Sequence, residues 1–349
     1  MITRTLYYQT AALGIATILI SSIIMLSGAS PITVLDSMLS GAFSTPDQIA
    51  RVFSTLSPLL LCACGLMFTF TAGLYNLGIE GQIVFGAIAT MVPIRLLENS
   101  LPPALVILLA IAFGTAGGML WGLFAGILNV YGRINEIFAG LGLNFVADGL
   151  ALYLIFGPWK RPGVASMSGT EQFGEVLWLP TFGNTEASPV ALAIALLALG
   201  ATLLVLRGTY YGLQLRAVGY NLRAAYVLGV PSVRQLLSAF AICGGLAGVA
   251  GALQVLAVFH RLIPSISSHL GYLALLVAML AGTNLWLLLP IAFFFSALNI
   301  GSLQLPLSLN LESSLAGVMQ GMLVLAVLLG RGLSETNWLD KISVLRRNV

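Results

Sequence analysis

Glu80 is the residue whose surroundings most constrain its chemistry. It lies in the stretch 71–82 (TAGLYNLGIEGQ), which joins two apolar runs and also holds Asn76 and Gln82. A carboxylate facing lipid is costly, so we expect Glu80 to face a helix bundle interior or a cavity. In one interpretation, Asn76, Glu80 and Gln82 line a polar pathway. In the other, Glu80 caps the exposed amides of a broken helix and holds two helices together.

A second polar pair, Asn144 and Asp148, lies in the apolar run 137–156. The two residues are four apart, so on a helix they share one face with Gly140. Such a stripe in an apolar helix is typical of a close-packed, hydrogen-bonding seam between helices. The same stripe could instead line the path of a solute, and the spacing leaves both interpretations open.

The stretch 220–231 (YNLRAAYVLGVP) predicts a short helix over 222–228. Asn221 is a suitable N-cap, and Gly229 followed by Pro231 ends the helix. The helix presents apolar side chains beside Arg223, which suits docking on a partner protein. The alternative is a helix that lies on the membrane surface.

Several chemistries have no support in the sequence. No G-x-x-x-x-G-K-[ST] motif is present, so we expect no ATP hydrolysis by this chain. His260 and His269 flank a predicted outside loop without other metal ligands, and we take them as ordinary loop residues. Cys62, Cys64 and Cys243 lie in apolar runs and are expected to pack as small hydrophobes. The chain is expected to bind no cofactor or metal.

The elements that position these residues follow from composition. Of 349 residues, 58% are hydrophobic and 8% are charged, whereas soluble domains carry about 25% charged residues. Roughly 200 apolar residues, at about 20 for each crossing, predict about ten transmembrane helices. We therefore expect an all-α polytopic membrane protein. A soluble enzyme, a nucleic-acid-binding protein and a disordered scaffold are excluded.

The apolar runs predict ten spans, at residues 10–29, 52–72, 79–97, 103–128, 137–156, 189–206, 236–258, 270–282, 285–304 and 314–330. The first run imitates a secretory signal peptide, but we expect it to be retained as a span. The run 270–282 is too short to cross the bilayer as a helix. Together with the stretch 71–82, it predicts broken half-helices, which are typical of transporters.

The bias of lysine and arginine predicts the orientation. Both termini and the loop 207–235 are expected in the cytoplasm, and the loop 157–188 is expected outside as an ordered cap. The segment 31–51, also outside, is expected to form a short amphipathic helix along the interface. We expect residues 1–349 to form a single transmembrane domain.

Two long motifs give the sequence a family resemblance. The segment 72–82 (AGLYNLGIEGQ), followed by Gly86 and Ala87, resembles the permeases of bacterial ABC importers for simple sugars and nucleosides, the branched-chain amino acid/ribose-type family. The segment 211–252 resembles that family's cytoplasmic loop and following helix. The turn N-x-G-x-E-G-Q at 76–82 is closest to the nucleoside-type branch. One glycine that relatives often carry in the stretch 271–281 is missing here.

The resemblance implies a fold like that of type II ABC importers, in a bacterial plasma membrane. It implies a second permease, identical or homologous, and two ATPase subunits that use ATP and Mg²⁺. It also implies an extracytoplasmic substrate-binding protein and contact with membrane lipid, and no nucleic acid. The helix 222–228 would then be the coupling helix. The residues implied in ATPase coupling are Arg216, Asn221, Leu222, Arg223, Ala224, Ala225, Tyr226 and Gly229.

The function expected from this resemblance is transport of a nucleoside or nucleobase-like solute by alternating access. The alternatives are a permease for a monosaccharide (pentose or hexose) or for a heterocyclic vitamin. An alternative from another class is a proton-coupled secondary transporter, in which Glu80 or Asp148 would carry the proton.

Overall fold

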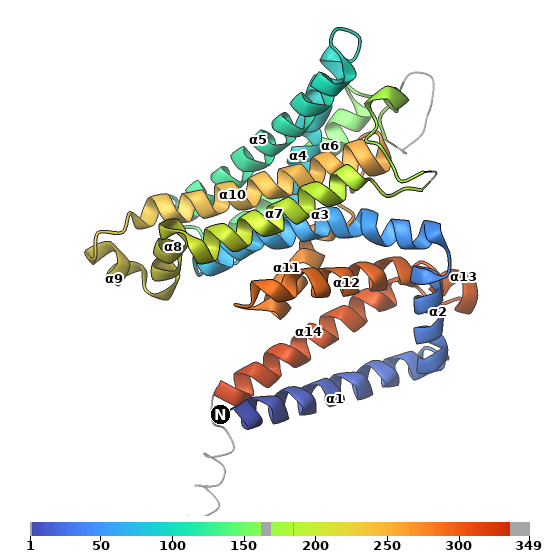
Figure 1. Ribbon diagram of the computed structural model, residues 1–349, viewed down its shortest axis with the longest axis vertical. Coiled ribbons are helices and arrows are strands. Elements are labelled where there is room, and N and C mark those ends of the chain that lie inside the picture. The colour runs from blue at the N-terminus through green and yellow to red at the C-terminus, as the bar shows by residue number, and fades with distance from the viewer. Residues whose placement is uncertain (1, 162–168, 184, 336–349) are drawn as a thin grey trace, which may run out of the picture. The chain divides into compact units, whose positions relative to one another are not determined.

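The computed structural model describes residues 2–161, 169–183 and 185–335 of the chain, and these are built almost entirely of helices (Figure 1). No strand occurs in these ranges. The long helices are α1 (Ile2–Leu26), α3 (Pro46–Thr71), α4 (Ile79–Leu97), α5 (Pro103–Val130), α6 (Glu136–Phe156), α7 (Pro189–Gly208), α10 (Ser232–Leu253) and α14 (Ser314–Glu335). The predicted all-α polytopic fold is confirmed.

Shorter elements connect or interrupt them. These are α2 (Pro31–Phe43), η1 (Glu175–Leu177), α8 (Tyr210–Tyr220), α9 (Leu222–Val227), α11 (Leu270–Ala281), η3 (Leu285–Leu287), α12 (Leu288–Ser302) and α13 (Leu305–Leu309), and the π-helical turn η2 (Gln254–Phe259) continues α10. As predicted, the chain is helical near 31–43 and leaves the helix between α3 and α4.

All ten predicted apolar runs are helical, but they are not equally long. Within the described residues, seven helices are long and apolar enough to cross a membrane, and an eighth is possible if the pair Gly14–Leu26 and Pro31–Phe43, bent by 95°, counts as one span. The helices Leu270–Ala281 and Ser314–Gly330 are shorter. The count of ten spans therefore stays a prediction.

The chain divides into two compact units, one made of the residues up to Ile49 with those from Ala297 on, the other of Ala50–Ser296. In the smaller unit α1 packs along α14 and α2 packs on α13. Its core consists of Ile24, Val34, Met38, Leu305 and Ala316. Whether the whole chain behaves as a single domain, as expected from the sequence, stays a prediction.

The larger unit is organised by close contact of α5 with α10 and α4 (Figure 1). The contact between α5 and α10 is made by glycines, because Gly114 and Gly118 face Gly248, and Gly122 faces Gly244. Between helices in lipid there is little hydrophobic driving force, so close approach of two backbones supplies the attraction. These glycines allow α10 to lie directly against α5.

We expect Gly118→Ala to destabilise the protein. A methyl group at this position would collide with the Gly244 carbonyl oxygen and the Gly248 backbone, and such overpacking costs about 1–3 kcal/mol. The thermal unfolding midpoint of the detergent-solubilised protein should fall. Gly200→Ala in α7 is the control, because nothing lies within 4 Å of the added carbon. Equal midpoints for the two variants would contradict the packing argument.

Candidate functional site

The break between α3 and α4 is held by a buried pair of amides. Asn76 Nδ2 donates to Gln82 Oε1 at 3.1 Å and to Cys243 Sγ at 3.1 Å, and Gln82 Nε2 donates back to Asn76 Oδ1 at 3.3 Å. Both amide side chains are fully buried. The pair ties the turn to the start of α4 and to α10, and its polar atoms are satisfied inside the protein.

The N-terminus of α4 is capped by a residue of another helix. Its own N-cap residue, Gly78, has no side chain to offer. Asn144 of α6 takes that role, since its Oδ1 accepts from Gly81 N at 2.8 Å and its Nδ2 donates to Leu77 O at 2.9 Å. Gly140, one turn earlier on α6, leaves room for the Gly78 backbone. Asn144 therefore satisfies backbone groups that a broken helix exposes.

Glu80 performs the same task for α11. Its Oε2 accepts from Gly271 N at 2.8 Å, and its Oε1 accepts from the Ser267 hydroxyl at 2.6 Å. The carboxylate is buried and lies at the positive end of the α11 dipole. Gly271 has no room for a Cβ because Glu80 occupies that space. These are the hydrogen bonds that the capping interpretation requires, while a solute pathway along Asn76, Glu80 and Gln82 stays a prediction.

Together these contacts form a capping network of Asn144, Glu80, Gly271 and Tyr272. α6 caps α4, α4 caps α11, and Asn144 Nδ2 donates to the Tyr272 hydroxyl of α11 at 3.1 Å. Each exposed helix end thus finds its partner on a neighbouring helix. The network fixes three helices relative to each other at the point where two of them begin.

His269 has a role that its sequence neighbours did not predict. We expected an ordinary loop residue, but His269 is the N-cap residue of α11, and its Nδ1 lies 3.6 Å from Glu80 Oε1. Asp148 of α6, half-buried, interacts electrostatically with the same imidazole. The reason is that the loop 260–269 returns to the start of α4, which a reading along the chain does not reveal. The available signal was a polar Ser-Ser-His directly before a helix too short to span.

The helix α9 forms as predicted, with one small difference. Asn221 Oδ1 accepts from Ala224 N at 3.0 Å, and Gly229 adopts a φ of 84° after the helix. α9 ends at Val227, one residue before the predicted end. Ala225 is buried, whereas Tyr226 is 73% exposed and Leu228 is 81% exposed. The helix therefore keeps an apolar surface that the described part of the chain leaves uncovered.

Of the remaining residues implied in ATPase coupling, Leu222, Arg223 and Ala224 are exposed on α9. Arg216 has a partner within the chain, because its guanidinium donates to the Leu206 carbonyl in the last turn of α7. A cation at that position is favourable for the helix dipole. Arg216 thereby connects α8 to α7.

α8 also contacts the break between α3 and α4. Gly219, at the end of α8, lies against the backbone at Thr71 and Gly73, with no space for a Cβ. Gly73 has a φ of 79°, a conformation that glycine adopts without strain. The residues that lead into α9 are therefore packed directly on the turn that precedes α4.

The described part of the loop 157–188 is ordered against the end of α10. Thr170 N donates to Leu262 O at 2.8 Å, and Leu179 N donates to Leu256 O at 3.1 Å. The rings of Trp178 and His260 stack with centroids 3.8 Å apart. The predicted ordered cap agrees with these contacts, although residues 162–168 and 184 lie outside the described residues.

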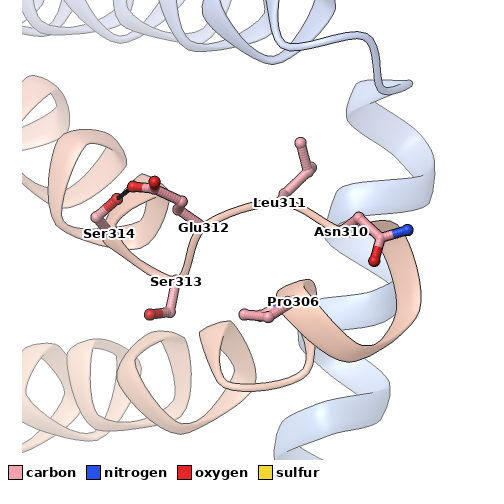
Figure 2. Close-up of a pocket in the computed structure, with 6 residues that line it drawn as sticks. All are labelled: Pro306, Asn310, Leu311, Glu312, Ser313 and Ser314. Atoms are coloured by element: carbon pink, nitrogen blue, oxygen red, sulfur yellow. Dashed lines mark hydrogen bonds between the residues drawn. The ribbon is translucent and has the colours of Figure 1, made fainter.

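A pocket of about 460 Å³ lies in the smaller unit, lined by Pro306 and residues 310–314 (Figure 2). Figure 2 shows the Ser314 hydroxyl bonded to Glu312 at its edge, at 3.0 Å. None of the predicted site residues lines this pocket. In the described ranges, no group of three or more histidine, cysteine, aspartate or glutamate side chains could hold a metal ion.

Residues 48–328 match the family described as "Branched-chain amino acid transport system / permease component". This match covers well over half of the chain, so the chain belongs to that family. It is a multi-pass membrane protein and a permease subunit of an ABC transporter, not an enzyme.

Three relatives of this chain are ABC transporter permeases named for a nucleoside or a sugar. The guanosine ABC transporter permease protein NupP of Bacillus subtilis is 25% identical, with 87% of this chain and 88% of the relative covered. The nucleoside ABC transporter permease protein NupB of Lactococcus lactis is 26% identical over 82% of this chain and 79% of the relative. The glucose ABC transporter permease protein TsgB13 of Haloferax volcanii is 26% identical, covering 79% and 75%.

We expect Glu80→Ala to destabilise the protein. The substitution leaves Gly271 N–H and the Ser267 hydroxyl without their acceptor, and each unsatisfied buried group costs about 1–3 kcal/mol. The thermal midpoint of the solubilised protein should fall, and Glu80→Gln, which keeps one acceptor oxygen, should recover part of the loss. Glu175→Ala, at an exposed position, is the control. A midpoint unchanged by Glu80→Ala would show that this carboxylate does not cap α11.

We also expect the loop 157–188 to loosen in acid. Burial lowers the pKa of His260 below its ordinary value. The neutral imidazole is thus favoured while the loop is attached. The contribution of His260 to the stability of this attachment is complete above about pH 6.5, the pKa of a free histidine. It is lost as the pH falls from there through the lowered pKa. Hydrogen exchange of the Thr170 and Leu179 amides, corrected for intrinsic rates, should show lower protection in acid. His260→Phe should remove this dependence, and if it persists in that variant, another group causes it.

Proposed function

We propose that this chain is the membrane subunit of an ATP-driven importer that takes up a nucleoside or nucleobase-like solute by alternating access. The observation that carries the proposal is α9, a capped helix with an uncovered apolar surface in a basic loop. The family supplies the class of transporter, and α9 supplies a means of connecting it to an energy source.

The chemistry of α9 suits a protein partner. Its N-cap and its glycine-terminated end keep it helical, while Tyr226, Val227 and Leu228 are exposed. The loop 207–235 contains four arginines and no acidic residue. An apolar patch with a charged rim is the usual composition of a docking site. We assign it to a groove of an ATPase subunit, with Arg223 at the edge of the contact.

The packing of α8 supports a short mechanical connection from α9 to α4 and α11, the helices that would move during transport. Gly219 lies on the turn before α4, and α4 caps α11 through Glu80. A displacement of α9 would therefore reach α4 through the backbone contact of Gly219, and α11 through the Glu80 side chain. This arrangement is what alternating access driven from one side requires.

The proposed assembly follows from the class of transporter. It contains two ATPase subunits that bind ATP and Mg²⁺, a second permease, identical or homologous, and an extracytoplasmic substrate-binding protein. This chain would bind none of those cofactors. We place it in the bacterial inner membrane with both termini in the cytoplasm, as the lysine and arginine bias favours. The loop 157–188 would then face the binding protein.

The solute is assigned from the relatives. NupP and NupB, named for guanosine and nucleosides, align over more than three quarters of both chains. A monosaccharide is the second candidate, because the glucose permease TsgB13 aligns with similar identity. A heterocyclic vitamin is the third candidate.

We expect Arg223→Glu to abolish uptake while leaving the fold intact. The tagged chain is purified in mild detergent with the proteins bound to it and reconstituted in liposomes for ATP-driven uptake of guanosine and of glucose. The wild-type complex should contain an ATPase and take up guanosine. Reversing a charge at a docking surface costs several kcal/mol, so the variant should lose the ATPase and, with it, ATP-driven uptake. Arg133→Glu, the same charge reversal in another loop, is the control.

Other outcomes would contradict the proposal in distinct ways. Uptake of glucose in place of guanosine would favour the second candidate. Uptake by the chain alone, driven by a pH gradient, would indicate a secondary transporter with Glu80 or Asp148 as the proton carrier. An Arg223→Glu complex that keeps its ATPase and its rate would overturn the role of α9.

A further inference from the structure

We propose that His269, Tyr272 and Asp148 form a transit subsite that contacts the aromatic base of the solute during its passage. This inference rests on the proposed function. It names where the base would be recognised within the membrane subunit and which chemistry recognises it.

Tyr272 belongs to the capping network and the other two residues adjoin it, but all three differ from Glu80 and Asn144 in exposure. Glu80 and Asn144 are buried and bonded to protein groups. The His269 side chain, in contrast, is 78% exposed. Tyr272 is 38% exposed, and Asp148 is half-buried. The buried network therefore holds a set of polar side chains that still present free surface.

That free surface does not suit lipid. An imidazole and a carboxylate facing hydrocarbon are costly. Backbone that leaves the helix at membrane depth persists only where it is buried or lines a watery cavity. The loop before α11 meets this condition, since Leu262 and Ile266 are fully buried and Ser267 is bonded to Glu80 in the first turn of α4. His269, at the end of this predicted outside loop, therefore faces water and not lipid.

The backbone of this loop is strained in a way that sets the direction of His269. Ser265, Ser268 and His269 have φ values of 56°, 49° and 59°, in the left-handed region. Such conformations cost free energy and persist where the surrounding structure enforces them, often at functional sites. Here the enforcing contacts are the bonds of Glu80 to Ser267 and Gly271. Glu80 thus acts as a positioning residue for the imidazole.

The side chains fit an aromatic heterocycle. The rings of His269 and Tyr272 are within 26° of parallel, with centroids 6.3 Å apart. Exposed aromatic faces of this kind stack on nucleobases irrespective of the base. Asp148, near His269, can accept hydrogen bonds from the amino or ring N–H groups of a base. A sugar has no π face for this surface, so the subsite favours a base, and a large purine over a smaller pyrimidine.

The test is the ratio of guanosine to cytidine uptake by the reconstituted complex. Tyr272→Leu removes the ring, and the ratio should fall at least about twofold, because the larger purine loses more stacking than the pyrimidine while both lose part of it. Tyr272→Phe keeps the ring but loses the hydroxyl that Asn144 contacts, so it should keep the wild-type ratio. Tyr153→Leu is the control, because it removes an exposed ring from a different helix, α6.

The outcomes separate the subsite from the proposed function. If the wild-type complex takes up no nucleoside, the proposed function fails, and the subsite fails with it. If nucleosides are taken up but Tyr272→Leu slows guanosine and cytidine equally, the ring is structural and only the subsite is overturned. An unchanged ratio in Tyr272→Leu overturns it as well. A lower ratio that Tyr272→Phe does not restore would attribute the effect to the hydroxyl and overturn the stacking role.

Discussion

The rest of this structure depends on the need to satisfy backbone groups where a helix is interrupted inside a membrane. Water is not available there, and each unpaired N–H or C=O costs several kcal/mol. The chain meets this requirement across helices, because Asn144 caps α4 and Glu80 caps α11. A carboxylate that would be costly in lipid is thereby stabilised by a helix dipole and two donors.

This solution connects parts of the chain that would otherwise be independent. The turn before α4 lies under Gly219 of α8, and α8 leads directly into α9. The same turn leads to Glu80 and from there to α11. The close packing of α5 on α10 through glycines provides a fixed frame beside these elements.

Much of the fold could be predicted because its causes are local. Apolar runs of sufficient length become helices, and Asn221 and Gly229 delimit α9 through their own backbone preferences. The Gly-rich stretch before Glu80 marked a break, and the run 270–282 was too short to span. Among the candidate site residues, the polar ones in spans were found because they are conspicuous there. His269 was not, since nothing in its neighbours along the chain indicates Glu80.

Residue type and spacing along the chain were enough to predict a helical membrane protein, its interrupted helices and the capped helix α9, since hydrophobicity and capping act over a few residues. The permease family came from the resemblance of two long motifs. The partners of the buried polar groups came only from the folded chain. The folded chain decides which amide Glu80 accepts from and why Arg216 binds the end of α7. It also brings Asp148 within electrostatic range of His269, a residue far away in the sequence. The hydrogen bonds of Glu80 and Arg216 exist only once the helices have packed, because each broken helix must take its cap from a neighbour.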